Sequence, residues 1–201
     1  MADDSIFHSL FILIFLGVFA ISATFRARAR RQGGTIPRAR EGGRTAAARL
    51  FLAAPLYLPI AAYLIHPAWM DWASLPLPAW VRWVGVAVGL AMLPAITWVM
   101  VSIGKNVSET YLTKEGHELV QHGPYRWVRH PLYSVATTTF VALGLVAANG
   151  YILIAAALAM IGIASLVVPR EEAELIRKFG AQYQEYQKRT GRFFPRVRGG
   201  A

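Results

Sequence analysis

The stretch HGPYRWVRHPLY, residues 122–133, contains two histidines, two arginines, three aromatic residues and two prolines within twelve positions. A run of apolar residues that reaches Ala148 follows it directly. Polar and aromatic side chains are therefore concentrated directly before an apolar segment. This position makes residues 122–133 the first candidates for a functional site.

The composition around this stretch is that of a membrane protein. The chain of 201 residues is 55% hydrophobic and 16% charged, and its mean hydropathy is +0.39, which is too apolar for an ordinary soluble domain. A membrane-spanning helix needs about 20 mostly apolar residues. We therefore predict an all-α integral membrane fold, a single domain over residues 1–201, with five transmembrane helices at 5–25, 47–66, 79–101, 132–148 and 151–168.

The basic residues predict the topology. Of 21 Lys and Arg, eight lie in 26–49, four in 105–129 and eight in 170–198, which leaves Arg82 alone. The positive-inside rule then places the N-terminus outside and the C-terminus in the cytoplasm, with 102–131 and 169–201 as cytoplasmic segments. The acidic start MADD and the arginines after the first apolar run argue against a cleaved signal peptide. Without cysteine, the chain has no disulfide framework or thiolate chemistry.

Several segments between the spans carry structural signals. The Arg-rich segment 26–44, with two Gly-Gly pairs and a proline, is predicted to be a flexible loop. The Trp- and Pro-rich segment 66–80 is typical of an interfacial belt. Gly85 and Gly89, spaced as GxxxG, favour close helix packing. Only Asn149 and Gly150 separate the last two spans, which predicts a tight antiparallel hairpin.

The C-terminal segment shows the period of an amphipathic helix. Its apolar stripe follows Pro169 and is interrupted by Gly180; the stripe consists of Leu175, Ile176, Phe179, Tyr183 and Tyr186. Because the hairpin of the last two spans returns the chain to the side on which it started, the motif at 129–131 and the pair Glu171 and Glu172 are expected to meet at the cytoplasmic face.

The ordered motifs resemble a known family. GHELVQHGPYRWVRHPLY at 116–133, followed about 40 residues later by EEAELIRKFGAQYQEYQKRTGRFFPR at 171–196, is similar to the integral-membrane methyltransferases of the isoprenylcysteine carboxyl methyltransferase and phospholipid methyltransferase superfamily. The resemblance covers about 80 residues and is closest to smaller prokaryotic members. It implies a prokaryotic inner (cytoplasmic) membrane protein whose cofactor pocket lies between transmembrane helices 4 and 5 and faces the cytoplasm.

The cofactor that the resemblance implies is S-adenosylmethionine, and the chain has no GxGxxG motif that would indicate a soluble-type cofactor domain. Tyr125 and Tyr133 can cover an aromatic face or the sulfonium, Arg129 can pair the methionine carboxylate, and Glu171 or Glu172 can bind the ribose hydroxyls or the amino group. Adjacent glutamates on a helix point about 100° apart, so one of the two can be structural. The remaining cofactor-binding candidates that the resemblance implies are His117, Leu119, Val120, Gly123, Pro124, His130 and Pro131.

Methyl transfer needs alignment and exclusion of water, and no nucleophilic protein residue. For a carboxylate acceptor, the candidate catalytic residues are Arg192 or Arg126, which would position the acceptor, together with Glu172 on the cofactor side. An amine acceptor, as in phospholipid methylation, would need a base such as a Glu or Tyr. The acceptor is expected to be lipophilic and to enter from the membrane.

Other classes of function remain open from the residues alone. A non-enzymatic transport or partner-binding protein could use the same scaffold, although spans one to three lack buried ionisable residues that would mark an ion pathway. The arginines of 26–44 favour lipid headgroups over nucleic acid as partners, because they lie next to a span. A metal site from His117, His122 and His130 is not expected, because the spacing of zinc ligands is missing.

Overall fold

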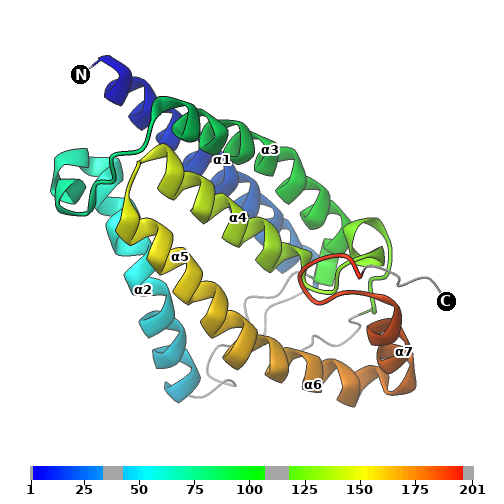
Figure 1. Cartoon of the computed structure of the whole chain (residues 1–201). Coiled ribbons are helices and arrows are strands. Elements are labelled where there is room, and N and C mark those ends of the chain that lie inside the picture. The colour runs from blue at the N-terminus through cyan, green and yellow to red at the C-terminus, as the bar shows by residue number, and fades with distance from the viewer. Residues whose placement is uncertain (1, 34–42, 107–117, 197–201) are drawn as a thin grey trace.

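The structure is a computed structural model that describes residues 2–33, 43–106 and 118–196. Every regular element in these ranges is a helix, which confirms the predicted all-α class. Figure 1 shows long helices gathered side by side, with the C-terminal helices returning to the end at which α4 begins. The helices are α1 (Ala2–Gly33), α2 (Gly43–Ile65), η2 (Pro67–Ala73), α3 (Ala79–Ile103), η3 (Gly104–Asn106), η4 (Gly123–Arg126), α4 (Pro131–Val146), α5 (Gly150–Gly162), η5 (Ile163–Val167), α6 (Val168–Phe179) and α7 (Ala181–Arg189).

Among the described residues, three helical runs are long and apolar enough to cross a membrane, namely Asp4–Arg31, Ala79–Ile103 and Gly150–Phe179. Two shorter apolar helices, Ala53–Ile65 and Pro131–Val146, coincide with the second and fourth predicted spans. The chain is therefore an integral membrane protein by the length and composition of its helices. The crossing of the membrane by all five segments stays a prediction.

Two boundaries differ from the sequence-based expectation. The prediction of a loop from Arg26 is wrong for its first residues, because α1 continues to Gly33; residues 34–42 lie outside the described residues. The fifth span also continues directly into α6 through a π-helical turn, Ile163–Val167. Pro169 lacks the N–H that would bond the carbonyl of residue 165, and the wider π turn lies across that position, so the helical run continues.

Glycines allow α3 to approach its neighbours closely. A Cβ on Gly85 would lie 2.9 Å from the carbonyl oxygen of Ala142 in α4, and one on Gly89 would lie 2.8 Å from the side chain of Ile14 in α1. Since apolar burial does not drive helix association in a membrane, such backbone proximity supplies packing energy instead. The GxxxG pattern thus fixes α3 between α1 and α4.

The predicted hairpin between the fourth and fifth spans is confirmed. Asn149 is buried and caps α5, because its Oδ1 accepts a hydrogen bond of 3.1 Å from the backbone N–H of Ile152. Its Nδ2 donates to the carbonyl of Met70, 3.0 Å away, which ties the hairpin to η2. The preceding residue, Ala148, has a positive φ of 47°, as a reversal this tight requires.

Arg82 lies at the end of the bundle where the hairpin between α4 and α5 is found. Its Nη1 pairs with Oδ1 of Asp4 at 2.8 Å, its Nε donates to the carbonyl of Val146 at 3.0 Å, and its guanidinium lies 3.9 Å from the ring centre of Phe7. These contacts join the starts of α1 and α3 to the end of α4. Because α4 is 16 residues long, its start lies roughly 24 Å from this end, at the end where α6 and α7 lie (Figure 1).

Candidate functional site

The GPYR turn, residues 123–126, forms the short 3-10 helix η4 just before α4. Gly123 has a φ of 57°, and a Cβ there would lie 2.2 Å from Oγ of Ser102. Glycine is needed at this position both for its backbone conformation and for the close approach to α3. Pro124 and Tyr125 are buried, and the carbonyl of Tyr125 accepts a 2.6 Å hydrogen bond from the Tyr186 hydroxyl of α7.

The C-terminal segment runs alongside the residues that enter α4. The backbone N–H groups of Arg129 and His130 donate to the carbonyls of Gly191 (2.8 Å) and Arg192 (3.0 Å), and the N–H of Gly191 donates to the carbonyl of Trp127 (3.0 Å). The Ser134 hydroxyl adds a bond of 2.7 Å to the carbonyl of Phe193. This short parallel pairing holds residues about 60 positions apart in register.

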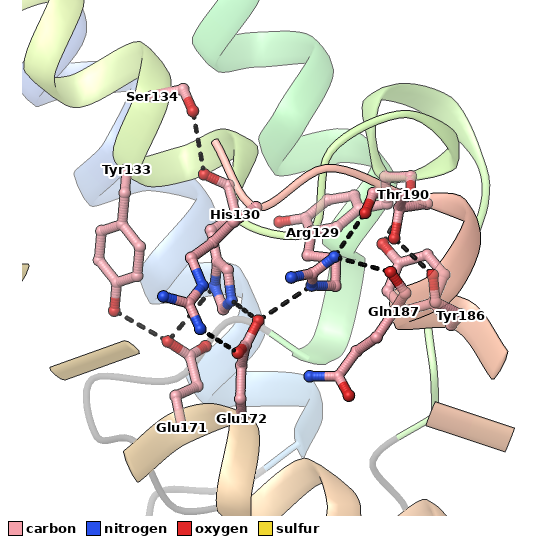
Figure 2. Close-up of polar contacts among 11 residues, drawn as sticks. Arg129, His130, Tyr133, Ser134, Glu171, Glu172, Tyr186, Gln187 and Thr190 are labelled. Carbon is pink, nitrogen blue, oxygen red and sulfur yellow. Dashed lines mark hydrogen bonds and ion pairs between the residues drawn. The ribbon is translucent and has the colours of Figure 1, made fainter. Parts of the chain in front are cut away.

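Glu172, in the first turns of α6, is the centre of a buried polar cluster (Figure 2). It is 5% exposed. Its Oε1 accepts from Nε of Arg129 at 2.9 Å and lies 3.3 Å from Nε2 of His130, while its Oε2 accepts from Nη2 of Arg192 at 2.8 Å. A single carboxylate therefore joins the start of α4, α6 and the C-terminal segment, as the sequence predicted for the first two.

The protonation of Glu172 follows from these partners. Burial by itself raises the pKa of a carboxyl group, but the hydrogen bonds from His130, Arg129 and Arg192 outweigh it and hold the pKa of Glu172 at about 2. Glu172 lies past the apolar residues of the fifth span, on the charged side of Val168. It is therefore an anion at neutral pH.

Arg129 donates hydrogen bonds both to α6 and to the end of α7. Besides Glu172, its Nη1 donates to the carbonyl of Gln187 at 3.1 Å and to that of Thr190. These carbonyls belong to the last turn of α7, where helical carbonyls lack intrahelical partners and carry the negative end of the helix dipole. Arg129 thus caps α7 and neutralises Glu172 at the same time (Figure 2).

His130 and Tyr133 lie beside the second glutamate. Nδ1 of His130 is 3.7 Å from Oε2 of Glu171, and the Tyr133 hydroxyl donates to the same oxygen at 3.1 Å. The ring of His130 stacks on that of Tyr133 with centres 5.8 Å apart and lies 6.1 Å from the ring centre of Phe193. Glu171 is 30% exposed at its side chain and Glu172 7%, so the two adjacent glutamates have different environments.

Some predicted site residues lie apart from this cluster. Arg126 is exposed, and its guanidinium lies 4.0 Å from the ring centre of Trp127. Leu119 and Val120 are half-buried and follow Glu118, whose backbone N–H and carbonyl are both bonded to the Asn106 side chain at the end of η3. Pro131 is buried in the first turn of α4. His117 lies outside the described residues.

The structure adds residues that the sequence did not single out for the site. Tyr183 and Tyr186 of α7 pack against each other with ring centres 5.8 Å apart, and both are buried. The signal for them was the apolar stripe that follows Pro169, which by itself indicated only an amphipathic helix. The other residues joined to the cluster by hydrogen bonds or ring contacts are Ser134, Gln187, Thr190 and Phe193.

Comparison with known proteins adds an independent line of evidence. A model of the isoprenylcysteine carboxyl methyltransferase family matches residues 84–177, which include η4, α4 and most of α6. The chain also resembles the nickel-cobalt-cadmium resistance protein NccN of Alcaligenes xylosoxydans xylosoxydans, at 32% identity over 117 residues. This alignment covers 57% of the chain and 53% of that protein.

An uncharacterised Bacillus subtilis (strain 168) protein, YpbQ, is 35% identical over 54 residues, which are 26% of the chain and 32% of YpbQ. The chain thus spans about half or less of the length of these two relatives. Among solved structures, a eukaryotic intramembrane Ras methyltransferase, isoprenylcysteine carboxyl methyltransferase, shares the fold with a TM-score of 0.53 at 20% identity. That alignment covers 96% of the chain and 70% of the methyltransferase. The family match over residues 84–177 and this shared fold both agree with the resemblance of the motifs to the isoprenylcysteine carboxyl methyltransferase family.

Proposed function

We propose that the protein is an S-adenosylmethionine-dependent methyltransferase that acts on a lipophilic acceptor and has its site on the cytoplasmic side of a prokaryotic inner membrane. The observation that carries this proposal is the joining of Arg129, His130 and Tyr133 with Glu171 and Glu172 in one cluster at the end of the apolar helices. These are the motif residues that the family resemblance assigns to the cofactor.

The chemistry of the cluster fits this cofactor. S-adenosylmethionine carries a sulfonium and an ammonium, for which the carboxylate of Glu171 and the ring of Tyr133 are suitable partners. Its carboxylate could pair with Arg129, in exchange for part of the bonds that Arg129 makes to Glu172 and α7. The buried Tyr183 hydroxyl has no hydrogen-bond partner among the described residues, as expected for a group that meets a ligand.

Each residue then has a physical role. The cofactor would supply a methyl group bound to a positively charged sulfur. As the acceptor bonds to the methyl carbon, the bond from that carbon to sulfur breaks, and the rest of the cofactor leaves as a neutral thioether. Glu172 positions Arg129, His130 and Arg192, and Gly123 allows the turn to lie close to α3. His130 and Phe193 cover the cluster from water, which strengthens its electrostatic interactions.

A carboxylate acceptor, as in isoprenylcysteine carboxyl methylation, is our first candidate. An ionised carboxylate needs no base, only a cation to position it, and Arg192 lies at the cluster with its side chain 43% exposed. Arg126 is the weaker candidate, because it lies against Trp127. An amine acceptor remains the alternative, with Glu171 as the base that would take the proton.

Isothermal titration with S-adenosylhomocysteine tests the proposal. We expect saturable binding to the purified protein in detergent and in nanodiscs, and heat-denatured protein serves as the control. An absence of binding in both would overturn the proposal and favour a transport or partner-binding protein on the same scaffold. A screen with labelled cofactor against isoprenoid thioether acids, phospholipids and hydrophobic amines then separates a carboxylate acceptor from an amine.

A further inference from the structure

Two tyrosines on α7 have nearly the same burial but different bonding. Tyr183 is 1% exposed and Tyr186 is 2% exposed, and their rings pack with centres 5.8 Å apart. The Tyr186 hydroxyl donates to the carbonyl of Tyr125 at 2.6 Å. The Tyr183 hydroxyl, in contrast, has no hydrogen-bond partner in residues 2–33, 43–106 and 118–196.

An unpaired hydroxyl in a buried position is unfavourable, because the group has lost its hydrogen bonds to water. Phenylalanine would fill the same volume without that cost. A buried tyrosine with an unpaired hydroxyl therefore points to a partner outside the described residues, such as a bound ligand.

The surroundings of Tyr183 indicate which kind of partner this is. Burial, together with the nearby carboxylates of Glu172 and Glu171, raises the pKa of Tyr183, and the neighbouring charge of Arg129 opposes that effect. The hydroxyl thus stays neutral, and the charges of Glu172, Glu171 and Arg129 act on it. Among such charges a charged ligand group gains more than a neutral one, and in S-adenosylhomocysteine the charges lie at the amino-acid end, whereas the adenine and the ribose are polar but neutral.

We propose that the Tyr183 hydroxyl forms a hydrogen bond with the charged amino-acid end of the bound cofactor. The inference rests on the proposed function. It means that α7 contributes a side chain to the cofactor site. The end of α7 is already fixed to the cluster by the bonds of Arg129 to Gln187 and Thr190. The site therefore includes a tyrosine about ten residues beyond the glutamate pair.

The test compares Tyr183→Phe with Tyr186→Phe, a matched control on the same helix. For Tyr183→Phe, we expect the dissociation constant of S-adenosylhomocysteine to rise roughly 10- to 150-fold, the range for a hydrogen bond to a charged group. The melting temperature without ligand should stay equal or rise, because no bond is lost. For Tyr186→Phe, the melting temperature without ligand should fall, because the carbonyl of Tyr125 loses its donor, and the affinity should fall less than for Tyr183→Phe, because no bond to the ligand is removed.

Each possible result either supports or overturns the inference about Tyr183. If the wild type does not bind S-adenosylhomocysteine, the proposed function fails and this inference fails with it. If the wild type and Tyr183→Phe bind equally well, only this inference is overturned. A lower melting temperature of Tyr183→Phe with unchanged affinity would show that a buried water satisfies the hydroxyl, and would also overturn it.

A second ligand checks which end of the cofactor is involved. 5′-Methylthioadenosine lacks the amino-acid end, so it should bind the wild type and Tyr183→Phe equally, or bind neither. A loss of its affinity confined to Tyr183→Phe would overturn the assignment to the amino-acid end.

Discussion

Arg192 of the C-terminal segment and Glu172 of α6 form an ion pair of 2.8 Å, in which a half-exposed arginine meets a buried carboxylate. The backbone carbonyl of Arg192 also accepts from the N–H of His130 at 3.0 Å. The C-terminal segment is therefore attached to the cluster by both a side chain and the main chain. Removal of the Arg192 side chain leaves the main-chain attachment in place.

Arg192→Ala should separate acceptor positioning from cofactor binding. Glu172 keeps Arg129 and His130 as partners in this variant, so the affinity for S-adenosylhomocysteine should change by less than about 3-fold. Turnover of the acceptor found in the screen should fall by about 10-fold or more, since a cation that positions the acceptor is lost. Steady-state kinetics together with titration measures both quantities.

Arg177→Ala is the control for Arg192→Ala, because Arg177 is exposed and pairs with Glu174 on the surface of α6. It should change neither affinity nor turnover. Wild-type turnover of Arg192→Ala would refute the acceptor role of Arg192.

Glu171→Gln and Glu172→Gln should affect different properties. Glu172→Gln leaves Arg129 without its buried counter-charge, so the protein should lose about 3–5 kcal/mol of stability. Glu171 is more exposed and accepts from the Tyr133 hydroxyl, so Glu171→Gln should keep nearly the wild-type melting temperature and lose cofactor affinity instead. Thermal unfolding with and without S-adenosylhomocysteine measures both; equal melting temperatures of the two variants would contradict the central role of Glu172.

Acid should destabilise the protein through Glu172. Its folded-state pKa of about 2 lies below the ordinary value of 4.5, so its stabilising contribution is fully present above about pH 4.5 and is lost as the pH falls towards 2. The melting temperature in detergent should fall more steeply between pH 5 and 3 (our chosen scan window) for the wild type than for Glu172→Gln. Parallel curves for the two proteins would show that other groups cause the acid sensitivity.

Two glycines with similar positive φ separate backbone strain from steric conflict. Gly180 has a φ of 54° with nothing within 4 Å of an added Cβ, whereas a Cβ on Gly123, with a φ of 57°, meets Ser102. Gly180→Ala should therefore cost only the backbone strain, about 1–3 kcal/mol, and Gly123→Ala should cost more. Equal losses in thermal unfolding would mean that the Ser102 side chain rotates away without cost.

The topology is open to a direct experiment. We expect reporter fusions near residue 3 and after Ala201 to place the N-terminus outside and the C-terminus in the cytoplasm, because the basic residues favour the cytoplasmic side and five spans put the two termini on opposite sides. If both reporters lay on the same side, one predicted span would not cross the membrane. The second and fourth predicted spans are the first to re-examine, because their apolar helices are the short ones.

The sequence by itself determined the helical class, the ranges of the apolar segments and the identity of the motif residues. Apolar runs of this length can satisfy their backbone groups in a membrane only as helices, and the hairpin at Asn149 and Gly150 follows from the brevity of the connection. The same hairpin brought Arg129 and His130 to Glu172, a pairing that connectivity alone predicted. These features depend on neighbours along the chain, and a sequence pattern reports such neighbours directly.

The tertiary structure alone decided the burial and the hydrogen-bond partners of the motif residues. Glu171 and Glu172 are adjacent in sequence, yet one is buried against two arginines and the other is partly exposed beside Tyr133. The bonding of Tyr186 and the unpaired hydroxyl of Tyr183 likewise depend on where the η4 turn packs against α7. Burial and hydrogen-bond partners arise between segments about 60 residues apart, and no local pattern encodes which of two similar side chains receives the partner.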